Sequence, residues 1–520
     1  MPLAGKSERR PVRARSVRGP SPRDLALPVI GMEAEFNVVL NGVEIDPRAY
    51  WGHPLAFIEG RLLPRQKSSF HLPTGGAVYF DRGVIEGVTP VIELGPGSTA
   101  RVVRNLWEGI GFVRAELTKW ERRHGHLVSL KGYSAHYNVS FELPAAEQGP
   151  TRNIKALALL LAHILPFPVA LAGTNRRSTG VGVRPRGNRI EVTVDFTPDP
   201  ALMIATATLV VGVVREVLAW PSYDLGLLDT LPIPTVDGIV PGKHTTRKGW
   251  LTKDHQYAQS PYTSDVDAPL WTVRGGRRLS LREIAREVAW HFRGSIRRYA
   301  DPFSFRLLFA LFEGRSRTLL DLDDRPAAYE DVGRLCAWGK VIDELKRRPR
   351  RRAPSAAPPA EPPAAAPVPV AGTKRAPAPS PAGALLVLAD AALATPLRSR
   401  ALSADGAAAL PGVAAATAAA GPGTPAPARV RWSRGSERRR AERRQRVEAV
   451  PFPDRRLSRS AYEKVFLKLV SGGRLRIGRQ TWTPVGMRGW YHAIFRNDVN
   501  GRERLFTIDQ LLTRMADWEG

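Results

Sequence analysis

The sequence has one cysteine, Cys336, among its 520 residues. A single thiol excludes an intramolecular disulfide framework and a cysteine-rich zinc site, and it is typical of a reducing compartment, so we expect a cytoplasmic protein. The first 22 residues are rich in arginine but contain no apolar stretch of the kind that a secretory signal needs, so we expect no export. No complete Walker or Rossmann fingerprint is present, which excludes the common glycine-rich phosphate loops.

A long uninterrupted apolar run is also missing. The most apolar stretch, residues 156–173, contains His163 and is interrupted by Pro166 and Pro168. Two prolines are poorly compatible with a helix that crosses a membrane. The stretch therefore predicts a buried helix that runs into a loop, and no membrane partner is expected.

Positive charge, by contrast, is abundant and unevenly distributed. The formal net charge is +28, and residues 1–23, 346–352 and 429–459 contribute +20 of it. The rest of the chain is only mildly basic, so the positive field belongs mainly to these three segments. The third segment includes Trp432 and Phe452, and this composition suits contact with nucleic acid or with an acidic protein. A solvating hinge before the last domain explains the same charges equally well.

Composition divides the chain into four parts. Residues 1–24 hold almost no apolar side chains and are predicted to be a disordered basic arm. Residues 25–345 have the composition of a globular domain. Residues 346–459 read as a linker, rich first in alanine and proline and then in arginine. Aromatic and aliphatic side chains return in residues 460–520, which predicts a small separate C-terminal domain.

The large globular part alternates short β-rich runs with helical patterns. The predicted strands are residues 29–40, 77–80, 127–140 and 189–196. The predicted helices follow Ser98 and Thr99, which can cap the first of them, and continue at residues 154–165 and 201–220. Ser280 and Glu283 form a capping box that predicts a further helix start. This order favours an α+β fold with a largely antiparallel sheet over a doubly wound fold.

A pair of carboxylates marks the first predicted strand. In a β-strand alternate side chains share a face, so Glu33 and Glu35 point together while Met32 and Phe36 face the other way. Two adjacent carboxylates repel each other unless a cation lies between them, and oxygen ligands select a hard ion such as Mg²⁺ or Mn²⁺. On its own, however, this pattern is more typical of a solvated polar strand edge.

Two further predicted strands also place polar side chains on one face, and this repetition favours a chemical role over a solvated edge. His136 and Asn138 share one face of the strand within residues 132–140. In residues 189–195 the polar side chains alternate with apolar ones, and they are Arg189, Glu191, Thr193 and Asp195. A sheet with one apolar face and one face of charge and hydroxyl groups is typical of a site that carries out chemistry.

A fourth segment, residues 75–93, adds more acidic side chains. Tyr79 and Asp81 share a strand face there. Glu86 and Glu93 are seven positions apart, which no single strand would align. The turn at residues 87–90 must therefore bring these two glutamates together if both serve one site.

The order of these motifs resembles the glutamine synthetase and glutamate-cysteine ligase superfamily, of the amidoligase type. The motifs are Glu-x-Glu at 33–35, Gly-Gly-x-x-Tyr-x-Asp at 75–81, Gly-x-x-x-His-x-Asn at 132–138 and Arg-x-Glu at 189–191. Within that superfamily, residues 75–93 are most similar to the Pup ligase and depupylase branch. The resemblance covers roughly residues 28–215 and implies a glutamine-synthetase-like curved, mainly antiparallel sheet backed by helices.

Carried over position by position, the resemblance implies a site for two metal ions and a nucleotide. The metal ligands that it implies are Glu33, Glu35, Glu86, Glu93, His136 and Glu191. Asp81 corresponds to the aspartate that acts as a base or nucleophile, and Arg189 is implied to act in catalysis. Asn138, Arg184 and Arg186 are implied to hold the nucleotide.

The resemblance also implies a reaction. The expected protein is an ATP-dependent carboxylate-amine ligase that uses Mg²⁺, or Mn²⁺, and forms an amide or isopeptide bond through an acyl phosphate. The acceptor would be a peptide, a protein or a small amine, which the C-terminal domain would recruit. Two alternatives stay open: a depupylase-like amide or isopeptide hydrolase of the same fold, and a catalytically weak protein that binds nucleic acid or acidic partners through its basic arms. Thr193 supports the last alternative, because glutamine synthetases commonly have an arginine there.

Overall fold

The computed structural model describes residues 25–322, with short gaps at 61, 67, 142–148, 179, 245–248 and 254–256, and residues 459–519. These two regions belong to one compact unit of the chain. The predicted basic arm, residues 1–24, and almost all of the predicted linker lie outside the described residues, as do residues 323–345 at the end of the predicted globular domain.

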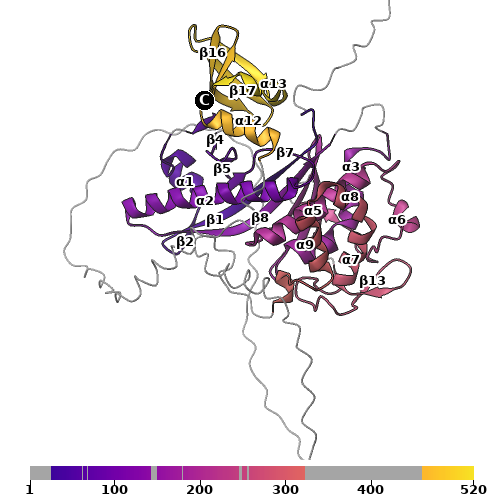
Figure 1. Cartoon of the computed structure of the whole chain (residues 1–520). Helices are drawn as coiled ribbons and strands as arrows, with labels where there is room; N and C mark the ends of the chain where they lie inside the picture. The colour runs from indigo at the N-terminus through magenta and orange to yellow at the C-terminus, as the bar shows by residue number, and fades with distance from the viewer. Residues whose placement is uncertain are drawn as a thin grey trace, which may run out of the picture. The chain divides into compact units, whose positions relative to one another are not determined.

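A 12-stranded sheet forms the centre of the first region, and all its pairings are antiparallel, as the sequence predicts (Figure 1). The strand order is β11-β12-β9-β10-β8-β1-β6-β5-β4-β3, with β2 and β7 also paired to β1. The strands are β1 (Val29–Leu40), β2 (Val43–Ile45), β3 (Leu63–Arg65), β4 (Ser69–His71), β5 (Ala77–Asp81), β6 (Val84–Val88), β7 (Ile92–Glu93), β8 (Val128–Ser140), β9 (Gly180–Pro185), β10 (Arg189–Asp195), β11 (Gly242–Lys243) and β12 (Trp250–Lys253).

Helices cover one face of this sheet. The α-helices are α1 (Pro47–Trp51), α2 (Ser98–His124), α3 (Ile154–Ile164), α4 (Pro166–Gly173), α5 (Pro200–Leu218), α6 (Leu227–Thr230), α7 (Leu281–His291), α8 (Arg293–Tyr299) and α9 (Pro302–Phe312). Short 3₁₀ turns, η1 (Pro54–Ala56) and η4 (Leu319–Asp321), and a hairpin of β13 (Trp271–Thr272) and β14 (Arg278–Leu279) complete the region. Met32 and Phe36 of β1 share the hydrophobic core with α2 and α5, so the alternate residues Glu33 and Glu35 face away from these helices.

Two local predictions about helix ends are wrong. Pro166 and Pro168 do not lead into a loop, because they lie in the first turn of α4, where a missing N–H is tolerated. A sharp bend of 62° separates α4 from α3. Ser98 and Thr99 lie inside the first turn of α2, and the capping position belongs to Gly97 in the left-handed conformation. The capping box at Ser280 and Glu283 is confirmed.

Helix α5 is the one described helix with the length and hydropathy of a membrane span, and 83% of its apolar window is buried inside the protein. The bent pair α3 and α4 also passes this test when it is taken together.

A β-bulge interrupts the pairing between β1 and β8. Glu35 pairs with Ser134 and Phe36 pairs with Gly132, so Tyr133 is the extra residue. A Cβ atom on Gly132 would lie 2.4 Å from the ring of Phe196, and a larger residue would therefore not fit at this position. Tyr133 itself is 60% exposed.

The second region forms a small unit with its own hydrophobic core, which we call the C-terminal module (residues 459–519). Its five strands follow the order β18-β17-β16-β15-β19. Its elements are α12 (Ala461–Val470), β15 (Arg474–Ile477), β16 (Gln480–Arg488), β17 (His492–Asn497), β18 (Glu503–Thr507), α13 (Ile508–Thr513), η6 (Met515–Asp517) and β19 (Trp518–Glu519).

Buried charge joins the C-terminal module to the large sheet region. Arg104 of α2 makes a bidentate contact with Glu463 of α12, at 2.8 and 3.0 Å, and the Glu463 side chain is fully buried. Arg459 lies 2.8 Å from Glu108 and 2.5 Å from Glu463. Arg104–Glu463 and Arg459–Glu108 are thus ion pairs between the two regions.

Candidate active site on the open face of the sheet

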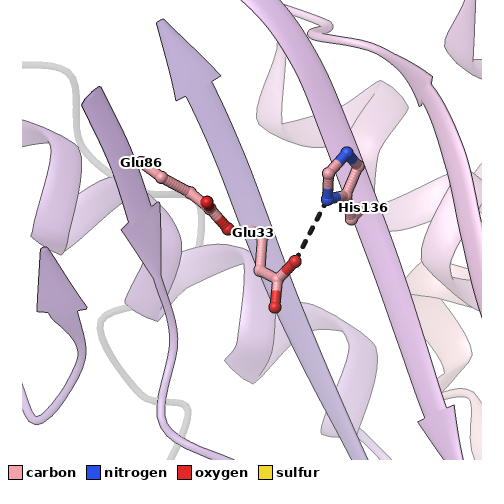
Figure 2. Close-up of side chains that lie close together, drawn as sticks. All are labelled: Glu33, Glu86 and His136. Atoms are coloured by element: carbon pink, nitrogen blue, oxygen red, sulfur yellow. Dashed lines mark hydrogen bonds and ion pairs between the residues drawn. The ribbon is translucent and has the colours of Figure 1, made fainter. Parts of the chain in front are cut away.

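Three neighbouring strands bring two carboxylates and an imidazole together (Figure 2). Glu33 of β1 pairs in register with His136 of β8, and Glu35 of β1 pairs with Glu86 of β6. The His136 Nδ1 lies 3.0 Å from a carboxylate oxygen of Glu33. One ligand atom each from Glu33, Glu86 and His136 lie within 4.8 Å of one another. These three side chains therefore lie on one face of the sheet.

A second acidic group lies next to the first. Glu35, Asp81 and Glu86 also offer oxygen atoms within 4.8 Å of one another, so Glu86 belongs to both groups. Asp81 ends β5 beside a tight turn, and its side chain is exposed, which leaves it open to a substrate. The Ser134 hydroxyl donates a hydrogen bond of 2.5 Å to Glu35 and lies 3.1 Å from His136 Nε2.

The protonation of this cluster reflects crowded negative charge. Burial and the neighbouring Glu33 carboxylate raise the pKa of Glu86 to about 9. Burial also opposes ionisation of Glu33, but the hydrogen bond and charge of His136 outweigh it and lower the pKa of Glu33. One carboxylate thus keeps a proton that a divalent cation would displace.

The donor set fits a hard cation. Carboxylate oxygens with one imidazole nitrogen suit Mg²⁺ or Mn²⁺, whereas a soft ion would select sulfur ligands. The raised pKa of Glu86 reflects burial and crowded negative charge, and a bound cation would neutralise that charge.

Glu191 has a different environment from the other predicted ligands. It lies on β10 with its side chain buried, and both Arg184 and Arg186 form ion pairs with it, the Arg186 contact being 2.5 Å. His136 Nδ1 lies 3.8 Å from Glu191. Glu191 is therefore neutralised by the two arginines that were predicted to hold phosphate, and it joins neither group of converging ligands in the described part of the chain.

Arg189 of β10, unlike Arg184 and Arg186, does not form an ion pair with Glu191. Its Nε donates a hydrogen bond of 2.8 Å to Asn138 Oδ1, and it forms no ion pair within the described residues. Its charge nevertheless acts on Glu33. Asn138 therefore positions a free guanidinium beside the carboxylates, which places Arg189 where an anionic substrate would bind.

Glu93 does not join the cluster, so the expected pairing of Glu86 with Glu93 is not found. Strands β6 and β7 both pair with β1, and Glu86 lies opposite Glu35 while Glu93 lies opposite Val29. Six positions along a strand correspond to about 20 Å. The Glu93 carboxylate instead accepts hydrogen bonds from the backbone N–H groups of Ala461 and Tyr462, at 2.5 and 3.2 Å, and so caps the N-terminus of α12.

Thr193 occupies the position where the resemblance would place an arginine. It lies opposite His136 in the β8–β10 register, and its hydroxyl lies 3.4 Å from His244 Nε2. A Cβ on Gly182 would lie 2.3 Å from the same hydroxyl, so the neighbouring strand approaches Thr193 closely. The cations near the carboxylates come from other positions.

Sequence reasoning missed two side chains of this site. Ser134 follows the same strand alternation as His136 and could have been found from it. Arg65 of β3 is close enough for its charge to be influenced by Glu33 and Glu86. No local pattern marks Arg65, because its position depends on contacts with the distant C-terminal module.

Comparison with known proteins finds a distant structural neighbour and no family match. No known family model matches the chain, and no curated protein matches it. Among solved structures, the chain has a distant neighbour in the complex between the prokaryotic ubiquitin-like protein Pup and its ligase PafA, with 12% identity and a TM-score of 0.33. The match covers 61% of this chain and 67% of that one. At this TM-score the likeness carries no argument about function.

Proposed function

We propose that the chain is an ATP-dependent carboxylate-amine ligase that uses Mg²⁺. The observation that carries this proposal is the convergence of Glu33, Glu86 and His136 on three adjacent strands, with Glu35 and Asp81 beside them. The order of the motifs along the sequence supports the same reading. A polyphosphate needs both divalent metal and guanidinium groups around it, and Arg189 provides a guanidinium without an acidic partner in the described structure.

In this proposal each side chain has one task. Mg²⁺, held by Glu33, Glu35, Glu86 and His136, would screen the charge of the phosphates and so favour attack by a substrate carboxylate. Arg189, fixed by Asn138, would bind the anionic substrate. The carboxylate oxygen forms a bond to the γ-phosphorus as ADP leaves, and the product is an acyl phosphate.

The second half of the reaction needs a base. An amine attacks the acyl carbon, phosphate leaves with the bonding electrons, and the proton of the amine passes to a carboxylate. Asp81 suits this task because it is the exposed member of the acidic groups, at the end of its strand. Glu86 is less suitable as the base, since its side chain is 3% exposed and it pairs in register with Glu35 on the central strand β1.

The test is ATP turnover with Mg²⁺ across a panel of amino acids and peptides, with ADP and the amide product both measured. We expect substrate-dependent ADP release in the wild type and a loss of at least about 100-fold in Glu33→Ala and in Asp81→Asn. Glu44→Gln is the matched control, since Glu44 is an exposed glutamate of the same sheet, on β2. Undiminished turnover in both site variants would sink the proposal. Amide cleavage without steady ADP release would identify the hydrolase instead.

A further inference from the structure

Arg65 lies between two aromatic rings from opposite ends of the chain. Its guanidinium carbon is 4.5 Å from the ring centroid of Trp490, in the turn between β16 and β17, and 6.0 Å from that of Tyr79, on β5. Tyr79 forms a hydrogen bond with Glu86 of the carboxylate cluster. Arg65 therefore connects the C-terminal module to the candidate active site.

The guanidinium has more hydrogen-bonding capacity than the protein uses. Its Nη1 donates to the Ser69 hydroxyl over 3.4 Å, which is a long contact. Its Nε is buried and has no hydrogen-bond partner, and no carboxylate of the described residues lies within ion-pair distance. A partly buried cation without an acidic partner is costly, so such a group is more typical of a binding site than of a structural contact.

The surrounding charges indicate what would satisfy Arg65. Arg65 lies over Tyr79, and Tyr79 pairs in register with Glu86 on β6, so Arg65 lies beside the carboxylate cluster. The charges of Glu33, Glu86 and Arg189 all act on it. Two guanidinium groups that repel each other next to a candidate metal site would both be stabilised by an added anion with several oxygens. Stacking on an aromatic ring leaves the N–H edges of a guanidinium free for such a ligand.

We propose that Arg65 binds an oxyanion of the substrate at the candidate active site and that Trp490 of the C-terminal module positions it. This inference rests on the proposed ligase function and deepens it, because the C-terminal module then completes the site. The oxyanion is either a phosphoryl group of the nucleotide or a carboxylate of the acid substrate. Trp490 acts through Arg65 and touches no substrate itself.

The experiment measures dissociation constants for magnesium tripolyphosphate and for glutarate with Mg²⁺, using full-length protein and titration calorimetry. Arg65→Met should weaken binding about 10- to 100-fold, as expected when a charge-assisted hydrogen bond is lost. Trp490→Leu should weaken it about 3- to 30-fold, and Trp490→Phe, which keeps a ring, should stay within about threefold of wild type. In the Arg65→Met background, Trp490→Leu should have no further effect on binding.

The controls separate binding from folding. Arg504→Met removes another arginine that lies over an aromatic ring, 4.8 Å from Phe506, on the edge strand β18 of the C-terminal sheet, and it should leave both constants unchanged. Thermal melting without ligand measures the structural cost of each variant, because Trp490 also packs on Phe466 and His71.

Each outcome decides a point. Weaker binding of tripolyphosphate assigns Arg65 to a phosphoryl group, and weaker binding of glutarate alone assigns it to a carboxylate. Unchanged binding of both ligands in Arg65→Met, while Glu33→Ala weakens them, would overturn the inference and leave the proposed function standing. If the wild type binds neither ligand with Mg²⁺, the inference and the proposed function both fail. An additive loss in the double variant would overturn the role of Trp490.

Discussion

The Nδ1 atom of His136 lies 3.0 Å from the Glu33 carboxylate, across a register pair that joins β8 to β1. Direct cross-strand neighbours keep this distance without help from loops, because the backbone ladder fixes both residues. The site is therefore built on central strands of the sheet.

The first prediction concerns metal binding. Glu33→Gln keeps the shape of the side chain but removes its charge, so the affinity for Mn²⁺ should fall at least about tenfold. Titration followed by electron paramagnetic resonance measures this directly. Glu44→Gln on β2 should bind as the wild type does. Equal affinities of Glu33→Gln and wild type would exclude Glu33 as a ligand.

The second prediction concerns Glu86 and pH. Its pKa is raised from 4.5 to about 9 in the folded protein, so between these values only the unfolded chain gives up the proton. Without metal, the stability that Glu86 contributes should therefore fall as the pH rises through this window, by at most about 1.4 kcal/mol per pH unit.

Urea unfolding in EDTA at pH 7 and pH 9 tests this prediction. The wild type should lose more stability than Glu86→Gln over this interval, and saturating Mg²⁺ should abolish the difference because the metal displaces the proton. The same pH response in wild type and Glu86→Gln would show that Glu86 is ionised in the metal-free fold.

The third prediction concerns His71, which is buried between the sheet and the C-terminal module. Burial and the charge of Arg65 lower its pKa from 6.5 to about 3, and its Nδ1 is the donor to the Gly76 carbonyl, 3.1 Å away. Its contribution to stability is present above pH 6.5 and should be lost as the pH falls toward 3.

Unfolding midpoints at pH 7 and pH 5 provide the measurement. The wild type should lose up to about 2 kcal/mol between them, which is the most that one histidine can contribute over this interval. His71→Phe keeps a ring against Phe466 and Trp490 and should be less stable at pH 7 but lack this part of the pH response. An identical pH response in both proteins would contradict the assignment.

The fourth prediction concerns the charge network of the module contact. Glu463→Gln removes the carboxylate that pairs with the buried Arg104, so the free energy of unfolding should drop by about 3 kcal/mol. Glu503→Gln breaks an exposed pair with Arg496 and should cost less than about 1 kcal/mol. Similar losses in the two variants, measured by denaturant unfolding, would contradict a buried role for Glu463.

Strand alternation predicted the central strand of the fold and the shared face of Glu33 and Glu35. The carboxylate strand was predicted at residues 29–40 and β1 has these bounds, because one face is apolar throughout. Each of Glu33, Glu86 and His136 was implied as a ligand by its motif, but Glu86 was expected to pair with Glu93, and only the strand register shows that it lies beside Glu33 and His136. The motif of each ligand can be read within a few residues of the linear sequence, whereas the grouping of the ligands depends on how the strands pair.

Features that depend on the C-terminal module could not be predicted in this way. The resemblance implied that Glu93 is a ligand, but its partners are the backbone groups of α12, which follow it by more than 360 positions. Arg65 has no motif, and only Trp490 shows that it is held in place. Local alternation fixes which face a side chain occupies but not which distant segment covers it.

The bulge at Tyr133 also explains how one strand can serve two purposes. On β8, the even-numbered Val128 and Leu130 point into the helix-covered core, yet after one inserted residue the even-numbered Ser134 and His136 point to the open face. The odd positions Ala135, Tyr137 and Val139 take over the core at the same point. The residue numbers that face the core thus change from even to odd at Tyr133. Deleting this single residue would move the side chains on one side of the bulge to the opposite face of the sheet.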